Sequence, residues 1–188
     1  PAARGAHVPL MSTFWLSSKK GKEAWLEPMV DRAAGRWQFA VRKGTPADRT
    51  AVKAGTKSGG GGFYCLLSGV PMPFEYIRAQ GEKGRLSSAM IAIVAEVPRG
   101  RNYLPATQEH VESAQSAVPS NFPESDLPEV ALGFSIQKYG FKKHWQIFNP
   151  RQLMAMVTLS DLVKGIKEDI RRDAGATGLS ESEAEAYA

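Results

Sequence analysis

The feature that most constrains this chain is a tight turn after Phe63-Tyr64 that holds its only cysteine. Residues 65–69 are Cys-Leu-Leu-Ser-Gly. A metal-binding knuckle has the form C-x-x-C-G, because two thiolates must converge on one ion and the glycine lets the backbone close around the sulfurs. Here Ser68 stands in place of the second thiolate. The turn therefore predicts a knuckle that keeps its frame and has lost its metal chemistry, with Cys65 and Ser68 as the remnant.

A weaker copy of the same pattern stands at the start of the sequence. Residues 5–10 (GAHVPL) parallel residues 69–74 (GVPMPF), and in that register Pro1 and Arg4 occupy the ligand positions. Two facing knuckles are what a zinc ribbon is made of. We therefore expect a β-rich, degenerate ribbon-like region over residues 1–105.

Composition places the chain among ordinary globular proteins, with 188 residues, 43% of them hydrophobic and 23% charged. No run approaches the roughly 20 apolar residues of a membrane helix, and no signal-peptide profile precedes the ribbon region. One cysteine forms no internal disulfide, which agrees with a reducing compartment. We expect a cytoplasmic protein with no membrane partner.

The net charge of +5 hides an asymmetry between the two halves. Residues 1–105 hold 16 Lys and Arg against 7 Asp and Glu, whereas residues 106–188 hold 8 against 12. Binding a polyanion requires clustered cations, so the first half is the candidate surface. The alternative is a solvated basic face with no partner.

Several segments of the first half show clear periodicity. Residues 7–18 are apolar enough for a buried strand, and residues 23–31 and 36–43 predict a hairpin with Trp37, Phe39 and Val41 on one face. Residues 46–62 end in four glycines and predict a mobile loop rather than a phosphate cradle. Residues 75–80 allow a short helix, and residues 88–97 predict a strand.

The second half is predicted to be largely helical. A helix after Thr107 and a Pro-rich acidic linker occupy residues 106–129. A helical region follows over residues 130–188, in which Asn149-Pro150 starts one long amphipathic helix to about Asp173. The last residues open another helix that stops early, as in a piece of a longer chain. The expected fold class is α+β, a ribbon-like half followed by a helical half.

Self-contained catalytic chemistry is missing from the sequence. There is no P-loop, G-x-S-x-G or H-E-x-x-H motif, and the three histidines, at positions 7, 110 and 144, have no metal-ligand spacing. Cys65 lies beside Leu66 and Leu67, which would raise its pKa and make it an inert packed thiol. The aromatic and basic residues from Lys138 to Trp145 allow two interpretations, a grip on nucleic acid or a packed amphipathic turn, and we favour the packed turn.

Four strings across the chain carry a family resemblance: VPLMSTFWLSSKKGKEAWLEP, GVPMPFEYIRAQGEKGR, GRNYLPATQEH and YGFKKHWQIFNPRQLMAMVTLSDLV. In order and spacing they resemble the middle of the large bacterial adenine-specific DNA methylases that contain a zinc ribbon. The resemblance implies a segment between an S-adenosylmethionine motif and a catalytic Asp-Pro-Pro-Tyr motif, neither of which this sequence includes. With the metal lost, packing of the aromatic side chains would stabilise the ribbon instead, namely Trp15, Trp25, Trp37, Phe63 and Tyr64.

By this analogy the chain is expected to be a non-catalytic insert that holds DNA for an N6-adenine methyltransferase, whose parent chain binds S-adenosylmethionine. The partners would be DNA and the remainder of the methyltransferase. First-rank phosphate contacts are Ser17, Ser18, Lys19, Lys20 and Lys22; second-rank candidates are Arg99, Arg101, Lys142, Lys143 and Arg151. The rival hypothesis is an interaction module that docks the methyltransferase core to a partner protein, such as a helicase of a phage-defence system.

Overall fold

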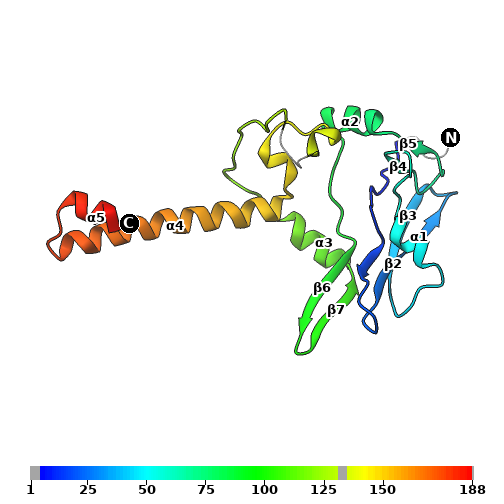
Figure 1. Ribbon diagram of the computed structural model, residues 1–188, viewed down its shortest axis with the longest axis horizontal. Helices are drawn as coiled ribbons and strands as arrows, with labels where there is room; N and C mark the ends of the chain where they lie inside the picture. Colours follow the sequence, from blue (N-terminus) through cyan, green and yellow to red (C-terminus); the bar gives the residue numbers. More distant parts are fainter. Residues whose placement is uncertain (1–4, 131–134, 188) are drawn as a thin grey trace. The chain divides into compact units, whose positions relative to one another are not determined.

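The computed structural model describes residues 5–130 and 135–187 and shows an α+β fold, as predicted (Figure 1). The first of two compact units comprises the chain to Val111 together with Pro128–Lys142. The second comprises Glu112–Leu127 and the chain from Lys143 onward. Within the described residues no helix is long and apolar enough to cross a membrane.

A three-stranded antiparallel sheet forms the centre of the first unit. Its strands are β1 (Trp15–Ser17), β2 (Ala24–Asp31) and β3 (Arg36–Lys43), in the order β1-β2-β3. The predicted hairpin is confirmed, with Ala24 opposite Lys43 and Asp31 opposite Arg36. The Asp31 carboxylate accepts a hydrogen bond from the Ala34 amide at 2.9 Å, which closes the turn. The predicted strand over residues 7–18 is shorter than expected and reduces to β1.

The core of this unit gathers around the sheet and the short helix α1 (Arg49–Ala54). Phe14, Leu26 and Val52 are buried together, with Trp15, Trp25, Phe39 and Val41 packed around them. The Phe14 and Phe39 rings lie 5.6 Å apart in a tilted arrangement. The alternation predicted for β3 therefore sets which of its side chains enter the core.

The prediction of a mobile loop over residues 46–62 is wrong, because the helix α1 forms within these residues. The Asp48 carboxylate caps α1 by accepting from the Thr50 and Ala51 amides, both at 2.9 Å. Val52 then enters the core. Gly55 ends the helix at φ 60°, where a Cβ atom would overlap the Met11 oxygen.

The knuckle segment leads into a helix. The strands β4 (Phe63–Tyr64) and β5 (Pro71–Met72) pair antiparallel, and α2 (Phe74–Glu82) follows, as the sequence allowed. α2 packs against the 3₁₀ turn η1 (Ile136–Tyr139). The Phe74 ring meets the Tyr139 ring edge-on at 5.7 Å. At Gly81 a Cβ atom would overlap the Tyr139 oxygen, so only glycine allows this approach.

A second hairpin, β6 (Ala92–Val97) and β7 (Gly100–Pro105), completes the first unit. The predicted strand over 88–97 begins four residues later than expected, and the chain turns back at Pro98-Arg99. The helix predicted after Thr107 is confirmed as α3 (Gln108–Gln115), and its residues divide between the two units.

Helices dominate the second unit, where α4 (Pro150–Ala176) begins at the predicted cap. Asn149 and Gln152 form a reciprocal capping box at 3.0 and 2.9 Å. α5 (Glu181–Tyr187) returns along α4 and is tied to it by the ion pair between Arg171 and Glu185. Before α4, the 3₁₀ turn η2 (His144–Ile147) and the irregular segment around Phe122 pack through Trp145.

Replacing Leu26 with alanine should lower the free energy of unfolding by about 2–5 kcal/mol, because a fully buried side chain leaves a cavity. Leu104→Ala, on β7 of the same unit and 39% exposed, is the matched control and should lose clearly less. Urea denaturation followed by tryptophan fluorescence measures both. Equal losses would contradict the assignment of this core.

Candidate nucleic-acid interface

The turn at Cys65 closes as the sequence predicts. The Cys65 amide donates to the Val70 oxygen at 2.8 Å, and the Gly69 amide donates back to the Cys65 oxygen at 2.7 Å. Gly69 adopts φ 72°, the left-handed conformation that glycine favours. The frame of a metal knuckle is therefore retained.

The sequence predicted a raised pKa for the Cys65 thiol, and this prediction is wrong. Burial raises the pKa of Cys65, but hydrogen bonds from the Ser68 hydroxyl and from the Ser68 and Leu67 amides stabilise the thiolate and together outweigh burial. The pKa of Cys65 is lowered as a result. Donors directed at the sulfur, which sequence reasoning from the neighbouring leucines overlooked, decide the sign.

No group of three metal-ligating side chains gathers within the described ranges 5–130 and 135–187. The other ligand positions of the ribbon pattern, Pro1 and Arg4, lie outside them. Two of the histidines bond locally, His110 with Thr107 and His144 with Ser125.

Ser68→Ala should raise the pKa of Cys65, because it removes the hydroxyl donor to the thiolate. Ultraviolet titration of the only thiolate measures this, with Cys65→Ser as the baseline. The wild type should gain stability over Ser68→Ala as pH rises from the folded pKa toward the unfolded value near 8.5, and lose that advantage at lower pH. An unchanged pKa would contradict the assigned hydrogen bond.

Hydrogen bonds hold the two knuckle arms at the turn end of the β2–β3 hairpin. The Trp37 indole donates to the His7 oxygen at 2.6 Å, and Arg32 donates to the Leu67 oxygen at 3.1 Å. The buried Thr56 joins the arms, because its amide donates to Met11 at 2.8 Å and its oxygen accepts from Tyr64 at 2.7 Å. These contacts join the segment from His7 to Met11 to the hairpin turn and to the strand that precedes Cys65.

The expected aromatic support is only partly present. Trp15 and Trp25 pack against the core, and Phe63 is buried against Phe74. Tyr64 is 45% exposed and contributes little packing. The prediction for Tyr64 was wrong because alternation along the two-residue strand β4 turns Phe63 inward and Tyr64 outward.

The β1–β2 turn presents the first-rank phosphate candidates together. Lys19 and Lys20 are exposed, and the turn closes when the Lys22 amide donates to the Lys19 oxygen at 2.9 Å. Ser17 lies at the end of β1 and accepts weakly from the Lys19 amide at 3.4 Å, while Ser18 is exposed. The turn is thus fixed by a backbone hydrogen bond and exposes the side chains of Lys19 and Lys20 to solvent.

Long-range contacts bring part of the second rank to the same place. The Lys22 ammonium donates to the backbone oxygen of Arg99, which lies in the turn between β6 and β7, at 2.9 Å. The Lys43 ammonium donates to the Asn102 side chain at 2.6 Å. We call Lys19, Lys20, Lys22, Lys43, Arg99 and Arg101 the basic cluster. Sequence reasoning missed Lys43, which the observed hairpin register places opposite Ala24, two residues after Lys22.

The basic cluster keeps its positive charge. None of its members forms an ion pair with a carboxylate of the described residues. The nearby acids Glu23 and Glu27 pair instead with Arg49 at 3.8 Å and Arg42 at 2.6 Å. Glu96, which lies opposite Arg101 in the ladder, adds negative charge within the cluster. The result is a local surplus of cations suited to an anionic ligand.

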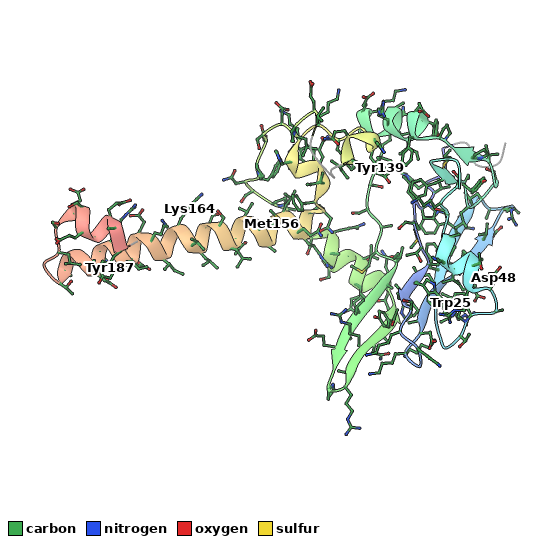
Figure 2. The ribbon with its side chains drawn as sticks, in the orientation of Figure 1. Trp25, Asp48, Tyr139, Met156, Lys164 and Tyr187 are labelled. Carbon is green, nitrogen blue, oxygen red and sulfur yellow. The ribbon has the colours of Figure 1, made fainter. Side chains whose placement is uncertain are left out.

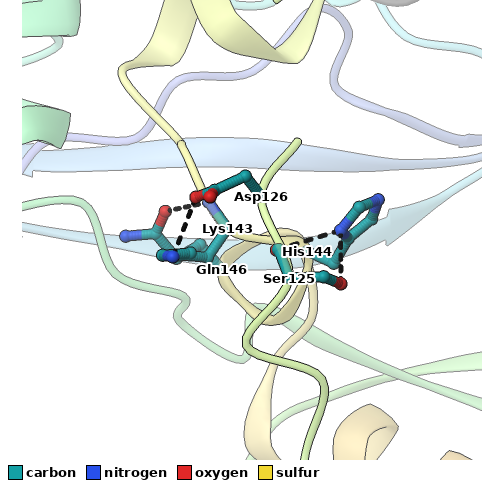
Figure 3. A network of polar contacts seen from close by, with 5 residues as sticks. All are labelled: Ser125, Asp126, Lys143, His144 and Gln146. Carbon is teal, nitrogen blue, oxygen red and sulfur yellow. Dashed lines mark hydrogen bonds and ion pairs between the residues drawn. The ribbon is translucent and has the colours of Figure 1, made fainter. Parts of the chain in front are cut away.

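The other second-rank candidates lie elsewhere in the fold. Lys143 pairs with Asp126 at 2.8 Å, in a network with Gln146 beside the His144–Ser125 contact (Figure 3). Arg151 is exposed in the first turn of α4, in the second unit. Lys142 ends the Pro128–Lys142 segment of the first unit. The structure thus assigns Lys143 an intramolecular role.

The aromatic residues between Lys138 and Trp145 are packed rather than presented. The Tyr139 ring (Figure 2) packs edge-on against the Phe74 ring, and the centres of the Trp145 and Phe122 rings lie 5.5 Å apart. The Lys138 ammonium lies 5.9 Å from the centre of the Phe74 ring. These contacts favour the packed amphipathic turn over a nucleic-acid grip.

Comparison with protein-family models, with curated proteins and with solved structures finds no match to this chain.

Proposed function

We propose that this chain is a non-catalytic, DNA-holding insert of an S-adenosylmethionine-dependent N6-adenine DNA methyltransferase, acting in the cytoplasm. The observation that supports it is the basic cluster, in which Lys22, on the same turn as Lys19 and Lys20, contacts the Arg99 backbone, and no member forms an ion pair with a carboxylate of the described residues. Two of the four strings that resemble the methylase family include members of this cluster, VPLMSTFWLSSKKGKEAWLEP and GRNYLPATQEH.

We expect the cofactor to bind outside this segment. The two best-formed hollows of the described surface lie along α4 near Gly165 and along the β2–β3 hairpin near Trp37, and a single helix or hairpin lines each. An adenosine moiety needs an enclosed pocket with converging polar groups, which neither offers. S-adenosylmethionine and the target adenine would bind the remainder of the methyltransferase, and this insert would hold the phosphate backbone.

Holding DNA is a demanding task for such an enzyme. A base-flipping methyltransferase spends a few kcal/mol to extrude its target, so the duplex must stay fixed beside the catalytic domain. Lysines that neutralise phosphates release condensed counterions and provide affinity without sequence preference. The β1–β2 turn, fixed by the Lys22–Arg99 contact, supplies such lysines on a defined support.

Changing Lys19, Lys20 and Lys22 together to alanine should flatten the dependence of log affinity on log salt by about 2–3, roughly 0.9 for each phosphate that the variant no longer neutralises. Fluorescence anisotropy with a labelled duplex over a salt series measures the slope. The matched control changes Lys53, Lys57 and Lys83, which are exposed in the same unit outside the basic cluster. Equal slopes for the two triple variants would contradict a DNA-holding role for this cluster.

One observation favours the alternative, an interaction module that docks the methyltransferase core to a partner protein such as a helicase of a phage-defence system. Apolar side chains repeat along α4 at helical spacing and stay exposed: Leu159 63%, Leu162 57%, Val163 57% and Ile166 56%. α5 covers only the far end of the helix, near Arg171. A protein partner that buried this stripe would gain hydrophobic stabilisation.

Under that alternative, changing Val163 and Ile166 to serine in the parent methyltransferase should weaken helicase binding at least tenfold, because each buried aliphatic side chain contributes about 1.5–3 kcal/mol. Serine, valine and isoleucine have similar helix propensities, so α4 should persist. Arg172→Gln, on the opposite side of α4 from Val163, is the control. Calorimetry with the purified partner distinguishes them, and unchanged affinity would reject the alternative.

A further inference from the structure

The β6–β7 hairpin has the dimensions of a groove-binding element. Val97 lies opposite Gly100, so two residues, Pro98 and Arg99, make the turn. Six residues in each strand extend roughly 20 Å at about 3.3 Å per residue. A two-stranded ribbon of this kind fits the major groove of B-form DNA, which is about 12 Å wide. Arg99 is the long charged side chain at the tip.

The charges of the hairpin lie on both of its faces. Side chains alternate along β7, so Asn102, which Lys43 contacts, and Arg101 point to opposite faces. Lys22 reaches the Asn102 face as well, because a Cβ atom at Gly100 would lie 3.4 Å from its ammonium. Cations therefore flank the hairpin on one side through Lys22 and Lys43, and on the other through Arg101.

This arrangement fits a groove better than a flat surface. A flat polyanion would meet one face of the hairpin and leave the cation on the other face unused. A DNA groove has a phosphate backbone along each wall, so cations on both faces find partners at once. Glu96 lies opposite Arg101 on the same face of the hairpin and offsets part of its charge. The face of Lys22 and Lys43 therefore carries the larger share of positive charge.

The surface composition favours a duplex over a single strand. Single-strand binding sites stack bases on exposed aromatic rings. The exposed apolar residues of this hairpin are Val94, Val97 and Leu104, which have no ring to stack on, and its one aromatic residue, Tyr103, is half-buried.

We propose that the β6–β7 hairpin enters the major groove of duplex DNA, where Arg99 contacts a guanine edge and Lys22, Lys43 and Arg101 contact the flanking phosphates. This inference rests on the proposed function and specifies its ligand as a double helix held in its major groove. Arg99 is suited to the contact because arginine donates in a bidentate manner to guanine O6 and N7.

The test uses the 188-residue chain and four labelled probes: a G·C-containing duplex, the same duplex with glucosylated hydroxymethylcytosine, the plain duplex saturated with netropsin, and an A·T-only duplex. Glucose fills the major groove and netropsin the minor groove. We expect glucosylation to weaken wild-type binding about tenfold or more and netropsin to leave it unchanged. The A·T-only duplex should bind about tenfold more weakly than the G·C-containing one, because it offers no guanine for the bidentate arginine.

Two single-charge variants separate groove contact from charge alone. Arg99→Ala should equalise the affinities for the G·C-containing and A·T-only duplexes, whereas Lys20→Ala should weaken both by the same factor. Both residues are exposed, and matching circular dichroism and melting curves will show that the fold is intact. Netropsin competition, indifference to glucosylation, or identical effects of the two variants would overturn the groove assignment while DNA binding stood. Absence of any duplex binding at low salt would instead overturn the proposed function itself.

Discussion

The first unit depends on the buried residue Thr56, whose hydroxyl and backbone groups join the segment around Met11 to the strand β4 at Tyr64. The Thr56 hydroxyl accepts a hydrogen bond from the Met11 amide at 2.9 Å. The Thr56 amide donates to the Met11 oxygen, and the Thr56 oxygen accepts from the Tyr64 amide. Thr56 is 4% exposed, so breaking this set would leave buried polar groups unsatisfied at about 1–3 kcal/mol each. These hydrogen bonds join segments far apart in the sequence, since Thr56 and Met11 are 45 residues apart. Hydrogen bonds from the Ser68 hydroxyl and from the Ser68 and Leu67 amides stabilise the Cys65 thiolate.

That joined framework determines where positive charge is displayed. The core around Leu26 fixes the sheet, the sheet fixes the β1–β2 turn and the end of β3, and both then contact the second hairpin. An ammonium group has three donors, so Lys22 and Lys43 each hold β7 with one hydrogen bond and keep donors and charge for a ligand. The same contacts thus stabilise the fold and concentrate the cations. Surface lysines scattered on a flexible loop would give charge without a fixed spacing.

The second unit is stabilised more by local contacts along its long helix than by a buried core. α4 is stabilised mainly by its capping box, by local ion pairs such as that of Asp161 with Lys164, and by α5 at its far end. Leu153 is its one buried residue in the described part, whereas the apolar stripe beyond it stays exposed. A helix with an uncovered apolar face has less tertiary stabilisation than its length suggests. This exposed stripe is the main physical reason to retain protein docking as an alternative to the proposed DNA-holding function.

Local sequence patterns determined the elements whose cause is local. Period-two alternation and a four-residue turn specified the β2–β3 hairpin, Asn149-Pro150 specified the start of α4, and Gly69 specified the closed knuckle turn. Only the tertiary structure decided the rest. α1 forms because Val52 finds a core built by distant strands, Lys143 meets Asp126 across an irregular segment, and Arg99 joins Lys22 although 77 residues separate them. The pKa of Cys65 and the exposure of Tyr64 depend likewise on which atoms the folded backbone directs at each side chain. Contacts between residues far apart in the chain leave no periodic signal in one sequence, so the candidate site emerged only when the folded chain brought its parts together.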